Sequence, residues 1–245
     1  MTTDSPLGEF FGDHLKELRQ RVVIVFCTVV LFTAIAYYFA KPLAFYLVRP
    51  IFLAAPEIKT LVYTHLTEAF VSYLKIAVLA GVAASFPIVS YELWMFVSPG
   101  LSRQEKRTAL KVSFWSTALF LAGIFFAYFI ALPEILAFLI GSTGMQLEAK
   151  PRLDSYLTFA ARTVITFGLA FEIPFLMVVA GRTGLVARKY FIEKRWISYV
   201  VILVIAFLLV AGDLLAAVLL ALPLIALYET GIVMMALFCR QKSED

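Results

Sequence analysis

Val22–Ala40, VVIVFCTVVLFTAIAYYFA, is a run of nineteen consecutive residues without a charge. A helix of about 20 residues, rising about 1.5 Å per residue, crosses the roughly 30 Å hydrocarbon core of a bilayer. The run is too long, and too aromatic at its end, for the apolar part of a cleavable signal peptide. It therefore predicts a membrane-spanning helix that stays in the mature protein.

Five more apolar blocks follow this run. The chain is 62% hydrophobic and 16% charged, with a mean hydropathy of +0.91, whereas soluble domains are roughly 45–50% apolar. The last apolar run, 196–239, is about twice as long as a bilayer accommodates, and Gly212-Asp213 interrupts it, so we expect a hairpin there. The sequence predicts one membrane domain over residues 1–245, an all-α polytopic protein. It consists of a tail over 1–21 and six transmembrane helices at about 22–40, 69–91, 112–132, 155–180, 196–212 and 214–238.

Lysine and arginine gather on one side of these spans. They are dense in the tail, in the connection after the second span and in the connection after the fourth. By the positive-inside rule this side is cytoplasmic, which places both termini in the cytoplasm. The outer connections, 41–67 and 133–154, contain short apolar stretches that we expect to form a helical cap. Scattered basic loops suit anionic lipid headgroups better than nucleic acid.

The sequence contains no arrangement of catalytic or metal-binding residues. Motifs of metalloproteases, serine hydrolases and nucleotide-binding proteins are absent, and His14 and His65 lie on opposite sides of the predicted membrane. Cys27 and Cys239 stand near opposite ends of the chain, with no neighbouring ligand. We therefore expect no enzyme activity, no metal and no cofactor.

Charges inside the spans require a physical reason, because each costs between about 3 and more than 10 kcal/mol in hydrocarbon. We expect Lys75 and Arg162 to extend toward the outer interface, since Arg162 is about 15 Å along the helix from Glu172. Glu172 is protonated, hydrated, or bonded to a polar group of a neighbouring or partner helix. A satisfied hydrogen bond between helices is the plainest of these interpretations.

The cytoplasmic segments hold carboxylates and aromatic residues. Asp13 is a suitable N-cap for a short helix in which Glu17 and Arg21, four residues apart, form an ion pair. Spacing alone favours a solvated pair on an interfacial helix. By composition alone, Trp94 and Phe96 belong to the aromatic belt at the membrane surface.

Four stretches carry a family resemblance over nearly the whole chain. The tail reads His14-Leu15-Lys16-Glu17-Leu18-Arg19-Gln20-Arg21 and resembles the HLxELRxR tail of TatC, the receptor subunit of the twin-arginine protein translocase. Three other stretches resemble segments of TatC in the same order, and they are FPIVSYELWMFVSPGL (86–101) with Glu105-Lys106-Arg107, FFAYF (125–129) with Leu132-Pro133, and FGLAFEIP (167–174).

The resemblance implies a fold and a function. The fold is a concave, glove-like bundle of six helices in the bacterial cytoplasmic (inner) membrane. The protein would bind twin-arginine signal peptides and, with single-span TatA- and TatB-like subunits, move folded cargo proteins across the membrane using the proton motive force. It would also self-associate in the receptor complex.

The same resemblance assigns roles to individual residues. Glu17 and Glu105 would contact the two arginines of the signal peptide, while Arg19 shapes the tail and Phe96 packs against the apolar part of the motif. Glu172 would lie at the centre of a groove for a partner's transmembrane helix.

This chain departs from the family pattern at the last hairpin, where Val210-Ala211-Gly212-Asp213 replaces a proline-rich turn. Asp213 remains a candidate partner-binding residue and helix cap. An ion- or proton-coupled small-molecule transporter is the alternative function. A membrane-embedded hydrolase has no nucleophile and base pair here.

Overall fold

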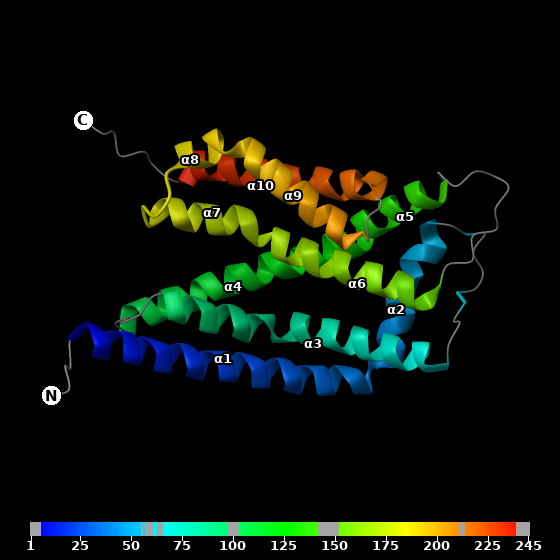
Figure 1. Cartoon of the computed structure of the whole chain (residues 1–245), viewed down its shortest axis with the longest axis horizontal. Coiled ribbons are helices and arrows are strands. Elements are labelled where there is room, and N and C mark those ends of the chain that lie inside the picture. Colours follow the sequence, from blue (N-terminus) through cyan, green and yellow to red (C-terminus); the bar gives the residue numbers. More distant parts are fainter. Residues whose placement is uncertain are drawn as a thin grey trace. The chain divides into compact units, whose positions relative to one another are not determined.

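The computed structural model describes residues 6–54, 56, 61–62, 66–97, 103–141, 152–210 and 214–238, and it describes side chains from Leu15 onward, except in 97–109 and at Leu66. These residues are almost entirely helical (Figure 1). The helices are α1 (Pro6–Tyr38), α2 (Ala40–Ala54), α3 (Leu66–Val97), α4 (Arg103–Phe126), the π-helix η1 (Ala127–Ala131), α5 (Leu132–Gly141), α6 (Leu153–Ala170), α7 (Glu172–Arg182), α8 (Arg188–Glu193), α9 (Arg195–Leu209) and α10 (Leu214–Phe238).

The predicted all-α membrane architecture is confirmed. Five stretches of helix are long and apolar enough to cross a bilayer, and α9 is a shorter apolar helix of 15 residues. The five are Leu15–Tyr38, Thr67–Phe96, Leu110–Gly141, Leu153–Arg182 and Leu214–Phe238. Together with α9 they correspond to the six predicted spans.

The chain forms two compact units. The first comprises Met1–Ala40 and Ile76–Ala118, and the second comprises Lys41–Lys75 and Leu119–Asp245. The first unit therefore contains α1, most of α3 and the first part of α4.

Small residues bring the helices of the first unit into close contact. A Cβ atom built on Gly81 of α3 would lie 2.3 Å from Thr33 Oγ1 and 2.6 Å from Thr33 Cα on α1. Between α3 and α4, the Ser90 hydroxyl donates to Ser116 Oγ at 3.0 Å. Close backbone approach and hydroxyl hydrogen bonds replace the hydrophobic effect, which does not operate between helices in lipid.

Packing in the second unit also depends on small residues. α10 lies against α7 and α9 (Figure 1), and a Cβ on Gly231 of α10 would lie 2.5 Å from Met177 Sδ on α7. At the end of α4, a Cβ on Gly123 would lie 2.4 Å from the Phe167 carbonyl oxygen of α6. The Phe126 ring packs beside Phe167, with 5.3 Å between the centroids.

Proline residues change the helix geometry without always ending a helix. Pro133 has no N–H and clashes with the carbonyl four residues earlier. The helix from Arg103 to Gly141 continues past it because η1 widens the turn immediately before. The sequence predicts a third span over about 112–132, and beyond Leu132 the structure continues as helix to Gly141 after a π-helical turn.

The fourth apolar block is divided into α6 and α7 at Phe171. Phe171 still donates to the Phe167 carbonyl at 3.0 Å. Pro174 has no N–H for the Ala170 carbonyl, so the regular ladder stops there. As a consequence, Glu172 becomes the first residue of a new helix inside a membrane-spanning stretch.

We predict that Gly81→Ala destabilises the first unit by roughly 1–3 kcal/mol, because the new methyl group overlaps the α1 backbone at Thr33. The measurement is the thermal unfolding midpoint in detergent. Gly141→Ala is the matched control, since a Cβ at Gly141 meets no atom within 4 Å. A Gly81→Ala variant that melts at or above the temperature of the control would contradict the close packing of α1 and α3.

Candidate functional site

Three charged side chains of α1 and α3 form a cluster near the start of the first apolar helix. Arg21 donates to Glu17 Oε1 from Nε at 3.1 Å and from Nη2 at 2.6 Å. The same guanidinium donates from Nη1 to Glu92 Oε2 at 2.7 Å. The Glu17–Arg21 ion pair that the spacing predicts is confirmed.

Glu92 is a member of this cluster that sequence reasoning missed. It belongs to the stretch FPIVSYELWMFVSPGL (86–101), and the sequence pattern predicts no role for it. The sequence does indicate that Glu92 needs a partner, because a lone carboxylate near the end of a long apolar helix is costly without one. Sequence alone does not identify that partner, which lies 71 residues away.

The cluster carries an excess of negative charge. Two carboxylates share one guanidinium, so the formal charge of the three-residue cluster is −1. Arg21 and Glu92 are 17% and 14% exposed, whereas Glu17 is 36% exposed. An ionised carboxylate has about four acceptor positions. Glu17 can therefore accept further donors from a cationic ligand while it stays bonded to Arg21.

The other residues predicted for this site are Phe96, Arg19 and Glu105, and none of them forms part of the ion-paired cluster that the structure describes. Phe96 is half-buried and lies four residues beyond Glu92, so it shares the Glu92 face of α3. Arg19 is exposed and, being two residues beyond Glu17, points from a different face of α1. Glu105 belongs to α4, but its side chain lies outside the described residues.

Charged residues also join the start of α3 to the start of α6. Lys75 Nζ donates to Asp154 Oδ1 at 2.5 Å and to Thr158 Oγ1 at 3.0 Å. Beside this pair, Arg152 lies 3.6 Å from Glu68, whose side chain is 5% exposed. The expectation that Lys75 only extends toward the outer interface is therefore incomplete, because Lys75 is bound by a carboxylate.

Glu172 is 6% exposed, at the first position of α7. Leu176 follows it by four residues on the same helical face and is 46% exposed, and Leu169 at the end of α6 is 53% exposed. A buried carboxylate is thus surrounded along the helix by leucines that the chain itself does not cover. Arg162, ten residues before Glu172 on α6, is exposed.

A further polar cluster, which sequence reasoning missed, connects the last two helices. Arg195 Nη2 lies 3.1 Å from Glu229 Oε2, and the Tyr199 hydroxyl donates to Glu229 Oε1. These contacts tie the start of α9 to the second half of α10. The predicted turn between them, with Asp213, lies outside the described residues, as does Cys239.

The chemistry of these sites is ionic recognition. Among the residues that the structure describes, no three His, Cys, Asp or Glu side chains are grouped as metal ligands. The Glu17 cluster offers carboxylate oxygens at a partly exposed position, which suits a guanidinium or an ammonium group.

Comparisons with known proteins point to one family. The family model described as "Sec-independent protein translocase protein (TatC)" matches residues 13–223. Similar proteins with that name occur in Desulforapulum autotrophicum, at 37% identity over 96% of this chain and 87% of the relative, and in Aquifex aeolicus, at 36% identity over 95% of this chain and 97% of the relative.

A solved structure agrees with this. The crystal structure entitled "Twin Arginine Translocase Receptor- TatC" has a TM-score of 0.85 and 35% identity, and the match covers 93% of this chain and 100% of that one. The similarity thus extends over both units and includes the stretches that hold Glu17, Glu92 and Glu172.

We predict that Arg21→Gln lowers the free energy of unfolding by about 1–3 kcal/mol, because two partly buried carboxylates lose their shared counterion. Adding Glu92→Gln should restore most of the loss by removing the less exposed of the two carboxylates. Denaturant or thermal unfolding of the single and double variants measures this coupling. Arg19→Gln, an exposed change on another face of α1, should stay within about 0.5 kcal/mol of wild type. Equal effects of Arg19→Gln and Arg21→Gln would contradict the cluster.

Proposed function

Because this chain belongs to the TatC family of Sec-independent protein translocase proteins, and is thus a multi-pass membrane component of protein transport, we propose that it binds twin-arginine signal peptides. The supporting observation is the Glu17–Arg21–Glu92 cluster, whose most exposed member is a carboxylate within an excess of negative charge. A guanidinium from a peptide neutralises that excess. The proposed role of this protein toward the peptide is recognition, with no catalytic step.

Arginine fits this site better than lysine for a geometric reason. The planar guanidinium donates two parallel hydrogen bonds to one carboxylate, whereas an ammonium acts as a point charge. In this proposal Glu17 binds one arginine of the pair and Glu105 binds the other. Arg19 shapes the tail, and Phe96, on the Glu92 face of α3, packs against apolar residues of the peptide.

The proposal extends to transport. The protein lies in the bacterial cytoplasmic (inner) membrane with both termini in the cytoplasm, and it moves folded cargo with the proton motive force. Single-span TatA- and TatB-like subunits and further copies of this chain complete the assembly. Glu172 contacts a partner helix, and Asp213 is a second contact at the last hairpin. The uncovered leucines at 169 and 176 support a protein surface beside Glu172.

We predict that the purified protein binds a fluorescent Arg-Arg signal peptide more tightly than the matching Lys-Lys peptide. Glu17→Ala with Glu105→Ala should weaken Arg-Arg binding about 30-fold, since each interfacial ion pair contributes about 1 kcal/mol and a factor of ten corresponds to about 1.4 kcal/mol. Fluorescence anisotropy in detergent or nanodiscs measures both affinities.

Glu134→Ala with Glu193→Ala is the matched control, because it also removes two carboxylates, both of them exposed and on other helices. The control should bind the Arg-Arg peptide as wild type does. Equal affinity for the two peptides, or equal weakening in both double variants, would refute the proposed peptide site.

We predict that Glu172→Ala reduces co-purification of a single-span partner about three- to fifteenfold, because one hydrogen bond between membrane helices contributes about 0.6–1.7 kcal/mol and a factor of ten corresponds to about 1.4 kcal/mol. Glu172→Gln should keep part of the interaction, since an amide still donates and accepts hydrogen bonds. Quantitative pull-down from membranes measures the effect. Glu134→Gln, an exposed carboxylate on α5, is the control. Wild-type partner recovery with Glu172→Ala would exclude Glu172 from the partner surface.

A further inference from the structure

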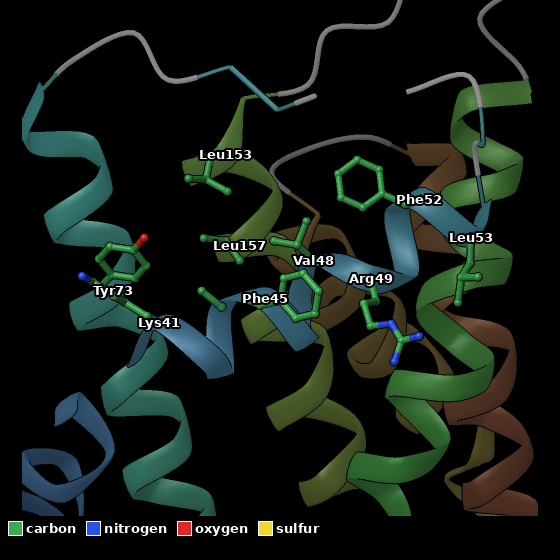
Figure 2. A pocket seen from close by; sticks show the side chains of 10 residues that line it. Lys41, Phe45, Val48, Arg49, Phe52, Leu53, Tyr73, Leu153 and Leu157 are labelled. Carbon is green, nitrogen blue, oxygen red and sulfur yellow. The ribbon is translucent and has the colours of Figure 1, made fainter. Parts of the chain in front are cut away.

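A groove lies along α2 in the second unit. Its volume is about 490 Å³, and its apolar lining comes from Ala44, Phe45, Val48, Phe52 and Leu53 of α2 and from Leu153 and Leu157 of α6. Figure 2 shows Phe45 near the middle of this surface, with Leu157 and Val48 close to it. A volume of a few hundred Å³ is typical of ligand sites. The lining is mainly hydrocarbon, which suits an acyl chain.

The charged side chains of the groove are both cationic. Lys41 and Arg49 line it from α2, and Tyr73 of α3 adds a hydroxyl, while no carboxylate is among the described residues that line it. In Figure 2 Lys41 and Arg49 lie on either side of Phe45. Eight residues separate them, which is about 12 Å along the helix.

These two cations form no ion pair with a carboxylate in the described part of the chain. Both are exposed. Nearby basic side chains behave differently, since Lys75 pairs with Asp154 and Arg152 pairs with Glu68. Among the described residues, Lys41 and Arg49 therefore leave a charge of +2 without a carboxylate partner beside an apolar surface.

The sequence around Lys41 has features that are typical of a membrane interface. α2 begins two residues after α1 ends, so Lys41 directly follows a membrane-spanning helix. Around it, Tyr38 is 84% exposed, Phe45 69% and Tyr46 56%. Exposed aromatic residues at the end of a span are typical of the headgroup region.

We propose that this groove is a binding site for an anionic phospholipid. One acyl chain lies along Phe45, Val48 and Leu157, and the headgroup phosphate is bound by Lys41 or Arg49. Basic pockets between transmembrane helices bind anionic headgroups by this combination of charge and apolar contact. A soluble anion would gain nothing from the apolar lining, and an apolar peptide would leave the two cations uncompensated. The site is independent of signal-peptide binding, because it uses none of those residues.

The test measures lipid bound to the full-length protein in detergent by native mass spectrometry, during titration with phosphatidylglycerol or with phosphatidylcholine of the same acyl chains. We expect tighter binding of phosphatidylglycerol to the wild-type protein. Lys41→Gln with Arg49→Gln should weaken that binding at least about fivefold and leave phosphatidylcholine binding unchanged, since the interfacial cation that binds the phosphate contributes about a factor of five. The matched control is Lys189→Gln with Lys194→Gln, two exposed lysines distant in sequence from the groove.

Three results would overturn the proposal. One is equal binding of the two lipids to wild type. Another is the same loss of phosphatidylglycerol in the groove variant and in the control. The third is displacement of the lipid by inorganic phosphate alone, which would show that the acyl chain does not contribute. Signal-peptide affinity, measured in the same groove variant, should equal that of wild type, so failure of the lipid site is distinguishable from failure of the proposed function.

Discussion

A charge within a hydrocarbon layer is costly unless another group compensates it or its side chain reaches the interface, and several ion pairs among the described residues provide that compensation by joining distant segments. Arg21 binds Glu92, Lys75 binds Asp154, and Arg195 binds Glu229. Removing one member of such a pair leaves the other desolvated without a counterion, which costs more than the pair itself contributes. These pairs therefore specify which helix ends meet, while dispersion contacts between the helices supply most of the attraction.

Close packing imposes the second constraint, and the residues that satisfy it also shape the sites. Gly81, Gly123 and Gly231 each lie where a side chain would collide with a neighbouring helix. Helices that are packed this closely have little room to change their backbone geometry. Two irregular turns in this chain each lie shortly before a proline. They are the π-helical turn before Pro133 and the break before Pro174. The second of them puts the Glu172 carboxylate in the first turn of α7.

The sequence predicts those features of the fold that depend on local pattern. Uncharged run length locates the apolar helices, and the four-residue spacing predicts the Glu17–Arg21 pair. Partners distant in sequence are not predictable in this way, because Glu92 and Asp154 are chosen by the packing of other helices. Local rules also fail at Pro133, since a proline is read as the end of a helix, yet a π-helical turn keeps the chain helical. Asp154 was assigned to a loop, although it belongs to the first turn of α6 and forms the ion pair of Lys75.

The need for a counterion near hydrocarbon also distinguishes charges that are paired within the fold from charges that are available to a ligand. Arg21 is fully engaged, with three hydrogen bonds to two carboxylates, so it belongs to the scaffold. Glu17 shares its counterion and stays 36% exposed, and Lys41 and Arg49 are exposed beside an apolar groove. In each case the uncompensated charge is of one sign, and an approaching ion of the opposite sign is held without breaking an internal pair. The first site, near the start of α1, favours a planar cation, and the second, just after its end, favours a phosphate with a hydrocarbon tail. Both proposals thus place ligand recognition where the ion pairing of the described residues is incomplete.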